Sequence, residues 1–338
     1  MTDRLPPVAL RRASYVALLV ACVHVVFGAI VRISGSGMGC ADSWPKCRHP
    51  DGNTYWFPPF DHPQIVIEWT HRLLAVLLLA AVASLVAVAW RRRAELRTAG
   101  LPSVLAPAAT ALGLGVLAAA FGAVTVFLEN PAWATAVHKV IAASLLAAIV
   151  AAVIRAGGLG ATRLAAQRAA GALVTAKTAR GALAATGLTL SAILMGAFTA
   201  KTPDAAIACK GFPLCGAGSL GGGPQHIQLT HRVIAYLLVL HLIGLAIAVA
   251  RRREAGALVT ATRVALGVAL LQVVLAVGML HTNFTVAAIR SMHQATGMGL
   301  WIVTFATFYL ARMAGDERGA EHAPTARDPR PATVGGAA

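Results

Sequence analysis

Long apolar runs separated by short polar segments dominate the chain. A helix needs about 20 predominantly apolar residues to cross a bilayer. Eight runs reach that length, near residues 12–32, 65–90, 101–127, 134–154, 181–200, 227–250, 258–281 and 289–312. The pattern therefore predicts an all-α integral membrane protein with eight transmembrane helices.

Two segments that begin such runs are near copies of each other. Glu68–Leu78 and Gln228–Leu238 are identical at six of eleven positions, and both contain Thr-His-Arg. Residues 122–138 correspond in the same way to residues 278–293. A parallel duplication of this kind predicts two tandem four-helix bundles, with Gly and Ala at close helix contacts. The predicted parts are an N-terminal bundle at 1–157, a cytoplasmic linker at 158–178, a C-terminal bundle at 179–314 and a disordered cytoplasmic tail at 315–338.

Composition and charge placement support a membrane protein. Charged residues make up 12% of the chain, about half of the ~25% usual in soluble domains. Of 29 Lys and Arg residues, 20 fall on one side of the eight-helix arrangement, together with both termini. By the positive-inside rule that side is the cytoplasm. The net charge of +16 thus comes from loops that flank helices, whereas nucleic-acid binding needs a folded basic face with aromatic groups.

Four of the five cysteines fall in two predicted external loops. Cys40 and Cys47 lie in the first loop, Cys209 and Cys215 lie in the matching loop of the second half, and an aromatic-Pro-x-Cys sequence ends both pairs. Outside the cell such close pairs predict one local disulfide per loop. A metal site that uses Cys40, Cys47 and His49 is the alternative, although it lacks a clear fourth ligand. Spacing does not separate a structural disulfide from a redox-active one.

Four histidines lie near the outer ends of the even-numbered runs, namely His71, His138, His231 and His293. Two imidazoles in one four-helix bundle can ligate a haem iron from both sides. A hydrogen-bonded core histidine is the usual alternative for a single intramembrane histidine, but four at repeat-related positions favour ligands. Zinc or copper is less well matched, because two histidines without a nearby carboxylate or thiolate leave the site incomplete.

Other polar residues in the runs are less informative. Arg72 and Arg232 directly follow two proposed ligands, so they are candidates for pairing with haem propionates, with a snorkelling side chain as the alternative. His24 and His241 lie deeper and have no repeat partner, so we expect them to form hydrogen bonds in the core. His281 lies near the outer surface and receives no role.

Glu68 lies three residues before His71, so on a helix both side chains share one face. A carboxylate beside a haem can exchange protons or stabilise a cationic intermediate. The alternative is that it bonds an arginine or another helix. The matched position holds Gln228, which keeps the shape and hydrogen bonding but takes up no proton. This difference favours acid–base chemistry in the N-terminal bundle alone, with a permanent cofactor in the C-terminal bundle.

Taken together, the motifs resemble those of the haem A synthase family, membrane enzymes that convert haem O to haem A for cytochrome oxidase. The resemblance extends to about residue 312. It rests on both cysteine pairs and on the segments Glu68–Arg72, His138–Lys139, Thr230–Arg232 and His293–Gly297. The two external cysteine pairs match the bacterial type.

The resemblance implies an oxidoreductase that oxidises the C8 methyl group of haem O to a formyl group. His231 and His293 would then ligate the iron of a haem b cofactor, and His71 and His138 would hold the haem O substrate. Glu68 would be the catalytic acid, and the first-loop cysteine pair would be functionally important.

The resemblance also implies partners and a location. Haem O is the substrate, haem O synthase (a farnesyltransferase) and an electron acceptor such as quinone are candidate partners, and no nucleic acid is expected. The protein would lie in the cell membrane among lipid, with the histidine ends towards the extracellular side. The electron acceptor, the source of the formyl oxygen and a homo-oligomeric state stay open. The alternative functions are a di-haem b membrane electron carrier and a haem-trafficking protein without chemistry on haem.

Overall fold

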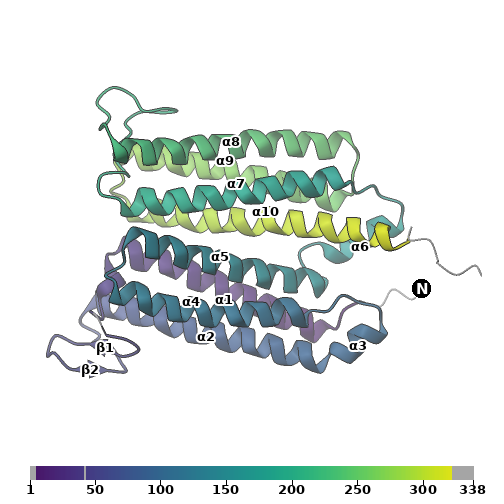
Figure 1. Ribbon diagram of the computed structural model, residues 1–338, viewed down its shortest axis with the longest axis horizontal. Coiled ribbons are helices and arrows are strands. Elements are labelled where there is room, and N and C mark those ends of the chain that lie inside the picture. The colour runs from purple at the N-terminus through teal and green to yellow at the C-terminus, as the bar shows by residue number, and fades with distance from the viewer. Residues whose placement is uncertain (1–4, 42, 322–338) are drawn as a thin grey trace, which may run out of the picture.

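The computed structural model describes residues 5–41 and 43–321, which are almost wholly helical (Figure 1). Its helices are α1 (Val8–Ile33), α2 (Pro63–Arg91), α3 (Arg93–Thr98), α4 (Leu105–Phe127), α5 (Ala132–Arg155), α6 (Ala161–Ala169), α7 (Ala176–Lys201), α8 (Gly223–Arg251), α9 (Gly256–His281) and α10 (Ala287–Glu321), with a 3₁₀ turn η1 (Ser36–Met38). Within this range eight helices are long and apolar enough to cross a membrane. The predicted class, an all-α multi-pass membrane protein, is confirmed.

The long helices form two bundles that lie side by side (Figure 1). Helices α1, α2, α4 and α5 make the first bundle, and α7, α8, α9 and α10 make the second. The bundles meet where α5 and α1 pack against α10 and where α5 packs against α7. The chain enters the first bundle and leaves the second at the same end, and the long loops after α1 and α7 lie at the other end (Figure 1).

Local sequence explains where several helices begin. Pro63 and Pro224 stand in the first turns of α2 and α8, where a residue without an N–H group loses no helical hydrogen bond. Thr175 caps α7, because its hydroxyl oxygen accepts a hydrogen bond from the N–H group of Thr178. Helix α7 therefore starts before the predicted run at residue 181.

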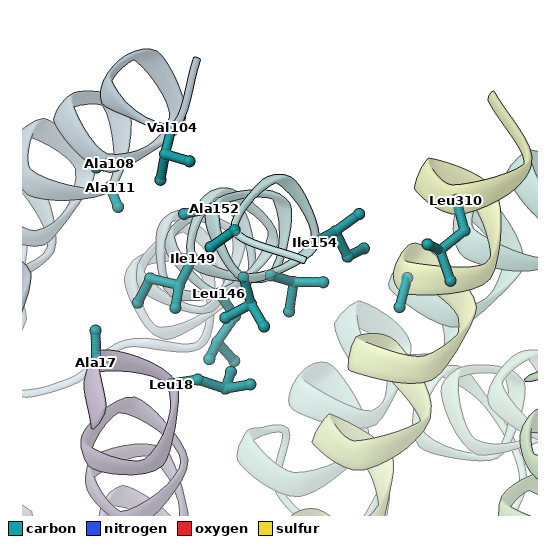
Figure 2. Close-up of a cluster of buried hydrophobic side chains, with 14 of the residues drawn as sticks. Ala17, Leu18, Val104, Ala108, Ala111, Leu146, Ile149, Ala152, Ile154 and Leu310 are labelled. Carbon is teal, nitrogen blue, oxygen red and sulfur yellow. The ribbon is translucent and has the colours of Figure 1, made fainter. Parts of the chain in front are cut away.

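The core of the first bundle forms around α5. Figure 2 shows Leu146 and Ile149 of α5 between Leu18 of α1 and Ala111 of α4, and Ile154 directed towards α10. Small residues allow these helices to approach closely. Close packing is important in a membrane because the lipid tails are as apolar as leucine, so apolar side chains alone do not drive helices together. The indole N–H of Trp301 in α10 also donates to the carbonyl of Ala143 in α5, at 2.9 Å. The Ile154 side chain, directed towards α10, and the Trp301 hydrogen bond both join the two bundles.

At the end of the second bundle that lies near the chain termini, the buried carboxylate of Glu254 joins neighbouring helices. Glu254 lies in the turn between α8 and α9. One of its oxygens accepts from the Thr175 hydroxyl, the Thr178 hydroxyl and the Arg252 Nε, at 2.7, 2.7 and 2.6 Å. Burial raises the pKa of Glu254, but these hydrogen bonds outweigh it and hold the pKa below its ordinary value. The network ties the start of α7 to the end of α8.

The segment boundaries differ in detail from the predicted parts. The short helix α6 lies inside the predicted linker, and α10 continues to Glu321, past the predicted bundle boundary at residue 314. The rest of the predicted tail, residues 322–338, lies outside the described residues. The division into parts at these positions stays a prediction.

Both predicted disulfides are confirmed. Cys40 and Cys47 are bonded with their Cα atoms 4.3 Å apart, and Cys209 and Cys215 with theirs 4.5 Å apart. In the first loop β1 (Cys47–Arg48) pairs with β2 (Thr54–Tyr55) in a short antiparallel ladder. These are the long loops at the end of the bundles away from the termini (Figure 1).

Candidate functional site

The four histidines singled out by sequence lie on the four helices that begin at the disulfide end. His138 and His293 stand in the second turns of α5 and α10, and His71 and His231 stand in the third turns of α2 and α8. All four therefore lie inside the bundles, a few turns below the disulfide loops.

The histidines are grouped as the sequence predicted, two in each bundle. His71 and His138 belong to α2 and α5 of the first bundle, and His231 and His293 belong to α8 and α10 of the second. Each of the four rings also has a buried Nδ1 atom without a hydrogen-bond partner in the described part of the chain. A buried polar atom normally has a partner, so these rings are suited to bind a group from outside the chain.

Glycines face three of these imidazole rings. A Cβ atom added at Gly28 in α1 would lie 3.1 Å from Cε1 of His71, and one added at Gly196 in α7 would lie 3.2 Å from Cε1 of His231. An added Cβ at Gly122 in α4 would lie 3.6 Å from Cε1 of His138. Gly28 and Gly196 occupy equivalent places in the two bundles, so the close approach of a ring to a neighbouring helix is part of the repeat.

His24 is a residue whose position sequence reasoning missed. Its ring stacks on that of His71, with centroids 4.3 Å apart and planes 4° from parallel. Its buried Nδ1 has no partner among the described residues, so the expected core hydrogen bond is wrong for this atom. His24 lies four residues before Gly28, and the equivalent residue before Gly196 is Ala192. The sequence showed that His24 has no repeat partner but gave no sign that its ring lies on that of His71.

His241 and His49 have ordinary partners. The Nε2 atom of His241 lies 2.8 Å from the carbonyl oxygen of Gly181, which confirms the expected core hydrogen bond. His49 is bonded through Nε2 to the carbonyl oxygen of Phe57. Since Cys40 and Cys47 are bonded to each other, the disulfide interpretation of the first loop holds over the metal interpretation.

Glu68 joins α2 to the first disulfide loop. Its Oε2 accepts a hydrogen bond from the backbone N–H of Cys40 at 2.7 Å, and its Oε1 lies 2.6 Å from Nη2 of Arg72. The side chain is only 5% exposed. The alternative considered from sequence, that Glu68 bonds an arginine, is thus what the structure shows, and its catalytic role stays a prediction.

Gln228 occupies the same place in the second bundle. Its Oε1 accepts from the backbone N–H of Cys209 at 2.5 Å, and its Nε2 donates to the carbonyl of Ala206 at 2.9 Å. The contact to the cysteine N–H group is the same in both bundles. Anchoring the disulfide loop therefore needs a side-chain oxygen at this position but no negative charge.

The two arginines after the proposed ligands also hold the loops. Arg72 donates to the carbonyls of Pro45 and Lys46 as well as to Glu68. Arg232, which has no carboxylate partner among the described residues, donates to the loop carbonyls of Cys209, Gly211, Pro213 and Leu214. Their predicted contact with haem propionates stays a prediction, and it would compete with these bonds.

The residues present fit a haem in each bundle. A bare metal ion usually takes three or more protein ligands, and the described residues contain no cluster of three or more His, Cys, Asp or Glu side chains suited to that. Haem iron already has four porphyrin nitrogens and needs only two axial imidazoles. Two histidines in each bundle meet that need.

The fold and the site define a class: multi-pass α-helical membrane proteins built from two bundles, each with paired intramembrane histidines at the end closed by a disulfide loop. The chain belongs to the COX15-CtaA family, described as cytochrome oxidase assembly protein, whose sequence model matches residues 11–305. The family match covers both bundles and both histidine pairs.

Similar proteins carry a more specific name. The chain is 42% identical over 67 residues to heme A synthase of Geobacillus kaustophilus, 31% over 118 residues to that of Bacillus pumilus and 40% over 90 residues to that of Symbiobacterium thermophilum. The aligned parts cover 20%, 34% and 26% of this chain and 20%, 36% and 28% of those relatives. The chain thus aligns with little more than a third of these relatives at most.

Proposed function

We propose that the protein is a haem A synthase, an oxidoreductase that converts the C8 methyl group of haem O to a formyl group. The observation that carries the proposal is the difference between Glu68 and Gln228 at otherwise equivalent sites. The names of the similar proteins point the same way. The proposal assigns the chemistry to the N-terminal bundle.

Two haems divide between the bundles in this proposal. His231 and His293 hold a resident haem b, and its iron supplies electron transfer when it is bound. His71 and His138 hold the substrate haem O. The stacked pair of His24 and His71 supports the asymmetry, because the C-terminal bundle has Ala192 in place of His24.

Glu68 handles the proton in this reaction. Oxidation of a methyl group to a formyl group proceeds through two successive two-electron steps, with an alcohol between them, and water can supply the oxygen. Each carboxylate oxygen of Glu68 accepts one hydrogen bond from the described residues and keeps a further lone pair that can accept a proton from that water. The negative charge can also stabilise positive charge at the methyl carbon. Gln228 anchors its loop without a charge, which supports a chemical reason for the charge of Glu68.

The orientation and partners complete the proposal. Disulfides persist in oxidising compartments, and basic residues concentrate at the opposite helix ends, so the histidine ends face the outside of the cell. The electrons leave to an acceptor such as quinone, and haem O arrives from haem O synthase. A site near the outer surface would be open to a substrate that partitions into the membrane.

Complementation tests the proposed function. A bacterial strain without its own haem A synthase, but with haem O synthase, would express this chain, and membrane absorbance spectra would report oxidase containing haem A. We expect wild type to restore that signal and Glu68→Gln to abolish it while haem b stays bound. Substitution of His231 or His293 by alanine should remove haem b. Protein that binds haem b but restores no haem A would overturn the proposal and indicate an electron carrier or a trafficking protein.

A further inference from the structure

Four cationic side chains lie at the histidine end on the helices that join the two bundles. Arg32 is in the last turn of α1, Lys139 is in the second turn of α5, Lys201 ends α7 and Arg290 is in the first turn of α10. We call these four residues the interbundle cation cluster. None of them has a role in the site described above.

Electrostatic contacts join these four side chains into one group. The helices that carry them pack against one another at the boundary between the bundles, α1 and α5 on α10 and α5 on α7, so the like charges of Lys139, Arg32, Lys201 and Arg290 lie near one another. Lys139 also acts on two histidines, His138 beside it in the first bundle and His231 in the second. The cluster therefore lies at the boundary between the two bundles, between the two proposed haem sites.

The hydrogen bonds of these cations go to neutral groups. Arg32 donates from Nε and Nη2 to Oε1 of Gln294, at 3.1 and 2.7 Å, and Lys201 donates from Nζ to the carbonyl of Asn130 at 3.2 Å. Among the described residues, no carboxylate lies within ion-pair distance of any of the four. Arg72 and Arg252, by contrast, each have a glutamate.

Four partly buried cations near one another are costly at membrane depth, because the low dielectric strengthens their repulsion. Such groups normally pair with anions or mark a ligand pathway. A bound group with several negative charges would remove the repulsion among all four at once. Lys139 directly follows the proposed ligand His138, and Gln294, which accepts from Arg32, directly follows the proposed ligand His293. The cluster is therefore next to a proposed iron ligand in each bundle.

We propose that the interbundle cation cluster binds the propionate carboxylates of two haems, of which one is held in each bundle. This inference rests on the proposed function, which puts a haem in each bundle. Two haems carry four propionates, which matches the four cations in charge. Arginine and lysine form strong charge-assisted hydrogen bonds with carboxylates. Held in this way, the propionate edges of both haems would lie at the boundary between the bundles.

Arg72 and Arg232 are less suited to this task in the observed arrangement. Arg72 is paired with Glu68, and Arg232 donates to four carbonyls of the second disulfide loop. A propionate at either arginine would have to displace these bonds. The side chains of Lys139 and Arg290 donate no hydrogen bond to any described residue, so they are the two positions to test first.

The test compares protohaem with its dimethyl ester, which has the same porphyrin ring and iron but no propionate charge. Full-length protein from cells that cannot make haem is titrated with each compound, and the absorbance of bis-histidine haem gives the affinity. We expect wild type to prefer protohaem. Lys139→Gln and Arg290→Gln should each reduce that preference about tenfold, the effect of losing one charge-assisted bond. The spectrum of the bound haem should remain bis-histidine.

Controls separate this proposal from misfolding and from the proposed function. Lys139→Arg keeps the charge and should keep the preference, and Arg263→Gln changes an exposed arginine at the opposite end and should have no effect. If both cluster variants retain the full preference for protohaem, the cluster does not bind propionates. Loss of copurifying anionic lipid in such variants would identify a phospholipid phosphate as the occupant instead. If wild type shows no bis-histidine spectrum with either compound, the haem sites themselves are refuted.

Discussion

Replacing Glu68 by glutamine or by alanine separates its structural task from its chemical one. Glutamine keeps an oxygen that can accept the Cys40 N–H, as Gln228 does for Cys209, and removes only the charge. Alanine removes the oxygen as well. Since Gln228 makes this contact without a charge in the second bundle, we expect the first bundle to keep its loop anchor when glutamine replaces Glu68.

The structure sets the size of each effect. Removing one partner of a buried ion pair costs about 3–5 kcal/mol, and the Arg72–Glu68 pair is 15% and 5% exposed. We expect about that loss for Glu68→Ala. For Glu68→Gln we expect a smaller loss, about 1–3 kcal/mol, because the amide oxygen keeps the bond from the Cys40 N–H while the amide NH2 group cannot accept from Arg72, which keeps its bonds to Pro45 and Lys46. Loss of proton transfer should lower haem A formation by about 10²–10⁴ in both variants.

Two measurements check these values: thermal unfolding of the purified protein in detergent, and haem A formation from supplied haem O. The matched control is Gln228→Ala, which should destabilise the second loop but leave the chemistry of the first bundle intact. Near-normal haem A formation by Glu68→Gln would refute the chemical role of the charge. Equal destabilisation by glutamine and alanine would refute the reasoning about loop anchoring.

Three further predictions concern other parts of the molecule. His24→Ala removes the ring stacked on His71, a contact worth about 0.5–1.5 kcal/mol, so haem titration should show up to about tenfold weaker binding in the N-terminal bundle only. Gly28→Ala puts a methyl group 3.1 Å from the His71 ring, and Gly196→Ala puts one 3.2 Å from the His231 ring. Absorbance spectra should show that each substitution changes the haem of its own bundle. A change in the haem of the other bundle would contradict the assignment. Glu254→Gln should destabilise the protein by about 1–3 kcal/mol at neutral pH. The pKa of Glu254 is lowered by folding, so its stabilisation is complete above the ordinary value of 4.5 and is lost as pH falls below it; unfolding curves of variant and wild type should converge in acid.

The membrane helices could be predicted closely from sequence because a hydrophobic span has a fixed minimum length. The predicted run at 65–90 became Pro63–Arg91, and that at 258–281 became Gly256–His281. The run at 101–127 began later, at Leu105, because the segment before it forms turns around Gly100. The short helices α3 and α6 were not predicted, because each has few residues and mixes polar with apolar positions. Neither helix therefore forms a long apolar run.

The histidine pairs were predictable because duplication marked them, and features without such a mark were not. His24 has no histidine partner in the repeat, so its stacking on His71 appears only in three dimensions. The bond from the Cys40 N–H to Glu68 joins residues 28 positions apart through the backbone of a loop, which composition and spacing do not encode. The interbundle cation cluster likewise gathers residues from four separate helices.

The central claim is that this protein oxidises haem O, and the most direct measurement is chromatography with mass analysis of the haem extracted from purified wild-type protein. The protein would be expressed in cells supplied with a haem O source, with the same cells lacking the chain as the control. We expect haem A or its alcohol precursor together with haem B. Haem B alone, with haem O unchanged in the membranes, would contradict it.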